Sequence, residues 1–214
     1  MNKTSALNLF CKIISVIAHP LLITTYLCAL LLFFTKGLIG NFSFDKNLSL
    51  INLIFICTFI LPLLVVILYL ITKDGTFHLK NILIEDANKR VIPFTLVAVI
   101  YAYLSYFLFT NWYSQIIIAI VFASISLSIF TSAIISIFWK ISIHSVGIGG
   151  LTGFISIIYL KYFQFDLLIA LFISILMSGI IMSSRIHLNA HYHSQVYSGW
   201  LLGFVLCYSS LYFL

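Results

Sequence analysis

The chain has 214 residues, of which 63% are apolar or aromatic and only 7% are charged, and its net charge is +6. A soluble domain carries about 25% charged residues, so this composition excludes an ordinary water-soluble protein, and also a disordered or collagen-like chain. The mean hydropathy of +1.18 indicates that much of the apolar surface faces lipid. The basic residues are spread over several loops, which is typical of contact with anionic lipid headgroups and not of nucleic-acid binding.

Seven apolar runs follow one another along the chain. A membrane-spanning helix needs about 20 apolar residues, so we expect an all-α integral membrane protein with six to seven transmembrane helices in a single domain over residues 1–214. The first run is longer than the apolar region of a cleaved signal peptide, and we expect it to remain as an anchor. The runs lie at about 13–34, 48–71, 93–109, 115–138, 146–163, 166–183 and 196–214.

Polar residues gather in three stretches, at 72–92, 139–145 and 184–195. If every apolar run crosses the membrane, two crossings separate each stretch from the next. The three stretches are therefore predicted to emerge at one membrane face. The lysine and arginine distribution leaves open which face this is, because several of these cations can serve a binding site instead of the topology.

The third polar stretch has the most specific pattern, with Ser184, Arg185, His191 and Gln195 just before the last apolar run. An arginine at the mouth of a membrane bundle needs a partner, and its planar guanidinium suits a phosphate. Gln195 stands four residues after His191, so on one helix face it could accept a hydrogen bond from a ring nitrogen and orient the ring. Arg185 and His191 converge only if the chain turns between them, and Asn189 favours such a turn.

The other two stretches supply a second histidine and more cations. Ser142 and His144 are two residues apart at one membrane boundary, and Lys89 and Arg90 precede Pro93 at another. Two histidines and several cations at one face suit phosphoryl transfer. One histidine can attack phosphorus, the cations can neutralise its oxygens, and the other histidine can protonate the leaving oxygen.

The segment 184–191 has the pattern Ser-Arg-x5-His and so resembles the third motif of the type 2 phosphatidic acid phosphatase and vanadium haloperoxidase superfamily. The stretch Ile141-Ser142-Ile143-His144 resembles a degenerate form of the second motif of that family, Pro-Ser-Gly-His. Arg90 near Pro93 resembles part of the first motif, Lys-x6-Arg-Pro, with Lys89 or Lys80 in place of its lysine. The resemblance covers about residues 72–214, the expected phosphatase-like core.

The resemblance implies a membrane lipid phosphate or polyprenyl diphosphate phosphatase that forms a phosphohistidine and needs no metal or other cofactor. It implies that His191 is the nucleophile, that His144 is the general acid, and that Gln195 takes the place of the family's usual aspartate. The partners implied are a lipid phosphate substrate and the surrounding lipids, in the bacterial inner (plasma) membrane. The implied phosphate-binding residues are Arg185, Arg90, Lys89, Ser142 and Ser184.

Two alternatives remain open at this stage. An amide at Gln195 brings no negative charge, and in the serine protease triad the equivalent change costs about 10⁴ in rate. The chain could therefore be a catalytically weakened or inactive relative that binds or transports lipid. His187, His191 and His193 also spell His-x3-His-x-His, which contains a helical metal-ligand spacing.

Overall fold

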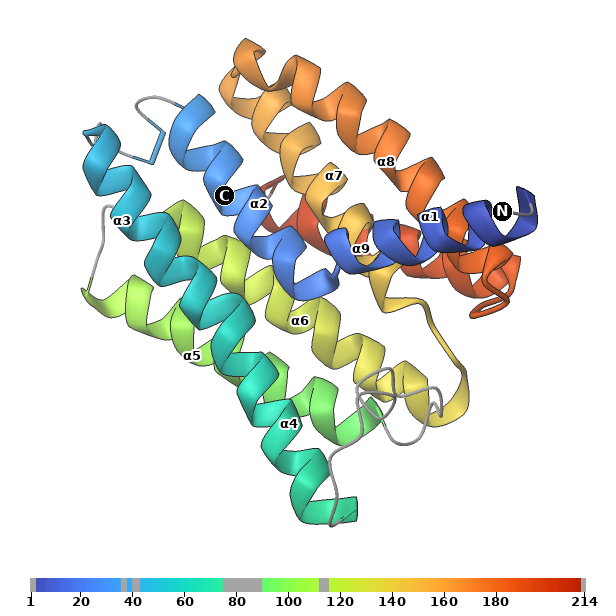
Figure 1. The fold of residues 1–214 in the computed structure, drawn as a ribbon. Helices are drawn as coiled ribbons and strands as arrows, with labels where there is room; N and C mark the ends of the chain where they lie inside the picture. The colour runs from blue at the N-terminus through green and yellow to red at the C-terminus, as the bar shows by residue number, and fades with distance from the viewer. Residues whose placement is uncertain (1–2, 36–37, 40–42, 75–89, 112–115, 213–214) are drawn as a thin grey trace.

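The computed structural model describes residues 3–35, 38–39, 43–74, 90–111 and 116–212, and all regular structure within these ranges is helical (Figure 1). This agrees with the predicted all-α class. Five helical segments are long and apolar enough to cross a membrane. They are Phe44–Thr72, Val91–Asn111 (α5), Ile116–Phe138 (α6), Ile143–Tyr162 (α7) and Phe165–His187.

Two of these five segments combine several elements. The first consists of α3 (Phe44–Phe55), a π-helical turn (Ile56–Ile60) and α4 (Leu61–Asp74). Another consists of a short 3₁₀ turn (Phe165–Leu167) followed by α8 (Leu168–His187).

The sequence predicts one continuous helix for the first apolar run, but the structure breaks this run into two helices. It lies in α1 (Lys3–Ile17) and α2 (Pro20–Phe34), which meet at an angle of 59°. Pro20 causes the break, because it has no N–H to donate and disfavours a helical conformation at the residue before it. His19 is accordingly extended, and its Nδ1 accepts a hydrogen bond from the Leu21 N–H at the start of α2. If the bent pair crosses as one span, the candidate spans number six.

The last apolar run forms α9 (His193–Tyr212), but α9 is not among the candidate spans. Its serines, its two glycines and Gln195 make it less apolar than the other long helices. The described helices therefore supply five candidate spans, or six with the bent pair, against the six to seven predicted.

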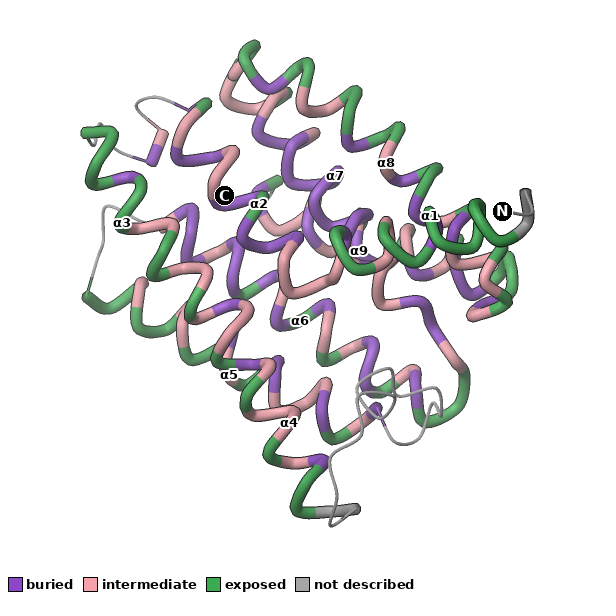
Figure 2. The backbone as a smooth tube through the Cα atoms, viewed as in Figure 1, coloured by how far each residue is buried: buried purple, intermediate pink, exposed green. Residues whose placement is uncertain are grey.

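The centre of the bundle is the pair formed by α7 and α9. Figure 2 shows α7 largely buried, surrounded by helices with exposed outer faces. A Cβ added at Gly153 would lie 2.6 Å from the Phe204 carbonyl oxygen, and one added at Gly203 would collide with the Val146 carbonyl. Gly199 and Gly203 form a Gly-x3-Gly pair in the last apolar run, a pattern that predicts close helix packing. The structure confirms this prediction, because only glycine allows two backbones to approach this closely.

Hydrogen bonds tie this pair together at both ends. At one end the Ser142 N–H, just before α7, donates to the Gln195 carbonyl oxygen at 3.2 Å. At the other end the Lys161 ammonium donates to the Leu211 carbonyl oxygen at 2.8 Å. The second and third polar stretches of the sequence are thus held side by side.

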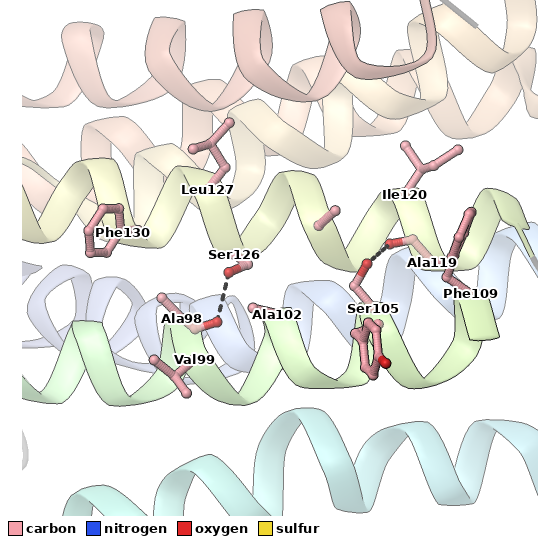
Figure 3. Close-up of a pocket in the computed structure, with 12 residues that line it drawn as sticks. Ala98, Val99, Ala102, Ser105, Phe109, Ala119, Ile120, Ser126, Leu127 and Phe130 are labelled. Carbon is pink, nitrogen blue, oxygen red and sulfur yellow. Dashed lines mark hydrogen bonds between the residues drawn. The ribbon is translucent and has the colours of Figure 1, made fainter. Parts of the chain in front are cut away.

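A second helix pair, α5 and α6, is joined by serine side chains. Ser126 Oγ donates to the Ala98 carbonyl oxygen and Ser105 Oγ donates to the Ala119 carbonyl oxygen, each at 2.7 Å (Figure 3). α5 begins directly after Arg90, and α6 ends two residues before Lys140. Both helices therefore lead to cations of the polar stretches.

Candidate functional site

The turn between α8 and α9 brings His191 back toward the bundle. α8 ends at His187, and Asn189 adopts a left-handed conformation with φ 51°. Asparagine is one of the few residues that tolerates this conformation, which often terminates helices. The Ala190 N–H then donates to the Arg185 carbonyl oxygen at 3.1 Å. The chain turns where the sequence predicted, at Asn189.

The ring of His191 is oriented by Gln195. Nδ1 of His191 lies 3.2 Å from the Gln195 side-chain oxygen, which also accepts from the Tyr192 N–H at 3.2 Å. The sequence predicts that His191 and Gln195 share one face of the last helix. In the structure α9 begins at His193, so His191 lies before the helix. Gln195 instead reaches back over the first turn, as a capping side chain does. Because the amide oxygen only accepts, Nδ1 carries the proton and Nε2 carries a free lone pair.

Burial and positive charge keep this histidine neutral. His191 is only 7% exposed, and burial lowers its pKa from the usual 6.5 to about 4. The charges of Arg185, Arg90 and Lys140 act in the same direction, and the hydrogen bond to Gln195 opposes them. Arg90, Lys140 and Arg185 come one from each of the three polar stretches, so described residues of all three lie near enough to this ring to act on it. Residues 75–89 of the first stretch lie outside the described residues, and the emergence of the three stretches at one membrane face stays a prediction.

His144 and Arg185 meet at Ser15, a residue that the sequence reasoning missed. Nε2 of His144 lies 3.1 Å from the Ser15 carbonyl oxygen, and Nη1 of Arg185 donates to Ser15 Oγ at 3.3 Å. The ring of His19 stands edge-on to that of His144, with centroids 6.0 Å apart. Ser15 and His19 come from the first apolar run, where their sequence spacing gives no indication of a contact more than 120 residues away.

One edge of the Arg185 guanidinium is left without a protein acceptor. Its Nε is buried and has no hydrogen-bond partner, and no carboxylate of the described residues pairs with this arginine. A buried N–H without an acceptor costs about 1–3 kcal/mol, and more when the group is charged. An anion that accepts from Nε and an Nη atom together would remove this cost.

The remaining predicted site residues differ in what they offer a ligand. Ser142 is fully buried, and its hydroxyl accepts from Ser145 at 3.0 Å while keeping a proton of its own to donate. Ser184 donates its hydroxyl proton to the Ile180 carbonyl oxygen of its own helix at 2.8 Å. That proton is therefore not directed at the site. Arg90 is buried directly before α5, whereas Lys89 lies outside the described residues.

The three histidines of the possible metal motif point to different partners. His187 Nε2 contacts the Asn8 side-chain oxygen at 2.9 Å, His191 contacts Gln195, and the His193 ring stacks on Tyr197. In the part of the chain that the structure describes, no three side chains of His, Cys, Asp or Glu are grouped as metal ligands. The geometry therefore favours separate roles for these histidines.

Comparison with known proteins adds no relative to this picture. No protein-family model, no curated protein and no solved structure matches the chain. The arrangement of residues in the site therefore carries the functional proposal by itself.

Proposed function

We propose that this chain is a membrane phosphatase that hydrolyses a lipid phosphate or a polyprenyl diphosphate through a phosphohistidine on His191. The observation that carries the proposal is the buried Nε of Arg185, which has no acceptor, together with a neutral histidine, His191, on which the Arg185 charge acts and whose Nε2 has no partner among the described residues. Positive charge around a neutral ring favours the binding of an anion, and the two parallel hydrogen bonds that arginine offers match phosphate. The resemblance of residues 184–191 to a phosphatase motif supports the same chemistry.

In the first half of the reaction, Arg185 binds two phosphate oxygens while Arg90 and Lys140 neutralise the developing charge. The Nε2 lone pair of His191 forms a bond to phosphorus as the bond from phosphorus to the leaving oxygen breaks. A carbonyl oxygen can only accept a hydrogen bond, so Nε2 of His144, which contacts the Ser15 carbonyl oxygen, carries a proton. The negative charge of the bound phosphate stabilises the doubly protonated form of His144, which then gives the proton on Nδ1 to the leaving oxygen.

In the second half, a water molecule attacks the phosphohistidine. His144 takes back a proton from this water at Nδ1, and an oxygen–phosphorus bond forms. The phosphorus–nitrogen bond breaks, and its electron pair returns to Nε2 of His191. The products are inorganic phosphate and a lipid alcohol, or a lipid monophosphate when the substrate is a diphosphate.

The proposal is tested with purified protein in lipid nanodiscs and a panel of lipid phosphates and polyprenyl diphosphates, in the presence of EDTA. We expect slow phosphate release that His191→Ala abolishes. His193→Ala, two residues away with its ring stacked on Tyr197, is the matched control and should retain most activity.

Two results would contradict the proposal. Phosphate release that EDTA abolishes and zinc restores would show a metal-dependent reaction. Saturable binding of a lipid phosphate without any release would instead support the lipid-binding alternative.

A further inference from the structure

An open apolar groove runs between α5 and α6. It encloses about 600 Å³ and is drawn in Figure 3. Alanines from both helices line it together with larger apolar side chains, so it is an open trough. The four alanines are Ala98, Ala102, Ala119 and Ala123, and Phe130 and Phe109 stand near its two ends (Figure 3).

The surface that the groove offers to a bound molecule is almost entirely apolar. The hydroxyls of Ser105 and Ser126 lie along it, but both donate to backbone carbonyl oxygens of the opposite helix (Figure 3). Since their protons are occupied in this way, they do not demand a polar ligand. The guest that fits is an apolar chain.

The register of the two helices places one end of the groove near the cationic site. Ser126 bonds to Ala98 and Ser105 bonds to Ala119, so α5 and α6 run antiparallel and the position on α5 falls by one residue for each residue gained on α6. On this register Phe130 lies level with residue 94, which is about 6 Å along the helix axis from Arg90. Arg90 is one of the three cations that act on His191.

The other end of the groove lies near the far end of α5, where Phe109 stands two residues before Asn111. From the level of Phe130 to Phe109, α5 rises by about 22 Å. One leaflet of the bilayer contributes about 15 Å of hydrocarbon, which is half of the roughly 30 Å core. The groove is therefore long enough to take a hydrocarbon chain through a whole leaflet, starting beside the headgroup.

We propose that the α5–α6 groove binds one hydrocarbon chain, acyl or isoprenoid, of a lipid whose phosphate is bound at Arg185 and Arg90. The placement of the headgroup rests on the proposed function. Charge complementarity sets the direction of the lipid, because the anionic end must lie where the cations are and the groove leads away from them. Lipid tails in the bilayer are as apolar as the groove, so the chain gains close packing and a fixed position for its phosphate.

The first test narrows the groove and compares two substrates with the same headgroup, one with a long chain and one with a short water-soluble chain. Ala102→Phe and Ala123→Phe place bulk in the trough at positions that are exposed, so folding should tolerate them. We expect kcat/KM for the long-chain lipid to fall about tenfold and that for the short-chain substrate to stay unchanged. Gly179→Phe is the matched control, because Gly179 is exposed and a Cβ added there meets nothing within 4 Å.

The second test does not require turnover. A lipid phosphate with a photoreactive group in its chain is crosslinked to the wild-type protein, and the labelled peptides are identified. We expect labelling within 98–130 that unlabelled lipid phosphate displaces and that the same lipid without phosphate does not. Acyl and isoprenoid probes compared in parallel identify which chain is preferred.

Several outcomes would overturn the groove assignment while leaving the proposed function intact. These are equal losses of activity for both chain lengths, labelling spread over α8 as much as over α5 and α6, or a dimer that the phenylalanine variants dissociate. Conversely, displaceable labelling of the groove without phosphate release from any substrate would retain the lipid site and reject the phosphatase.

Discussion

The α7–α9 pair and the α5–α6 pair both use small residues, with opposite results. At α7 and α9, glycines such as Gly153 and Gly203 bring backbone against backbone and leave no space for even a Cβ. At α5 and α6, alanines and serine-to-carbonyl bonds hold the two helices together but leave a groove of about 600 Å³ between larger side chains. The contact residues of the two pairs differ by one methyl group, since glycine allows the backbones of α7 and α9 to touch whereas alanine keeps α5 and α6 farther apart.

The two pairs also stand in different relations to the candidate site. The tight pair holds Ser142 and Gln195 together at its head, next to His191, and so determines the geometry of the chemistry. The grooved pair leads to Arg90 and Lys140, and we propose that it holds the hydrocarbon chain of the substrate. Four substitutions test this division of roles.

The largest effect should come from Gly203→Leu, which breaks the tight joint. Its side chain would collide with the Val146 carbonyl, so α7 and α9 must separate and the Ser142–Gln195 contact must be lost. We expect a loss of about 3 kcal/mol in the free energy of unfolding in detergent, with loss of phosphate release. Gly179→Leu should change neither quantity, because space is open there. Full activity in Gly203→Leu would show that the site does not depend on this joint.

Gln195→Glu should alter the chemistry at the head of the tight pair without opening it. A carboxylate in place of the amide would stabilise protonated His191, so the pKa should rise from its value of about 4. Since only neutral His191 can attack, the acidic limb of kcat/KM against pH should lie near pH 4 in the wild type and move to higher pH in the variant. Above that limb we expect a several-fold faster phosphate release, because the histidine is a stronger base.

Gln195→Ala serves as the comparison for this variant, since it removes the acceptor and leaves the ring free to rotate. Turnover in a folded Gln195→Glu protein that equals or falls below the wild type would show that Gln195 does not orient His191.

Lys161→Met removes the hydrogen bond at the far end of the tight pair. The Lys161 ammonium donates to the Leu211 carbonyl oxygen, and methionine keeps most of the apolar stem. We expect a loss of about 1.5 kcal/mol in unfolding free energy with unchanged phosphate release, because the site lies at the opposite end of α7. A large fall in activity with little loss of stability would contradict this separation.

The smallest effect should come from Ser126→Ala, which removes one of the two serine links of the grooved pair. Hydrogen bonds between membrane helices contribute about 0.6 kcal/mol on average, so thermal unfolding in detergent should shift only slightly. Ser124→Ala is a suitable control, since its hydroxyl donates to the Ile120 carbonyl oxygen of its own helix. A loss of stability several times larger would show that the groove depends on this one contact.

The sequence by itself determined the features that arise from local chemistry. Sustained hydropathy predicts helices wherever about 20 apolar residues follow one another, because lipid leaves the backbone no other partner than itself. The turn at Asn189 and the reach of Gln195 to His191 depend on residues within a few positions of each other, so spacing was sufficient to predict them. The close packing of Gly199 and Gly203 could be predicted because only glycine permits it.

Only the tertiary structure decided which distant side chains meet. The 59° bend at His19 folds α1 back so that Ser15 contacts both His144 and Arg185, and no periodicity relates these positions. The start of α9 after His191, and the groove between α5 and α6, also follow from how whole helices pack. Contacts between residues more than 100 positions apart depend on the packing energies of many residues together. A local sequence pattern carries no information about these energies and so cannot predict such contacts.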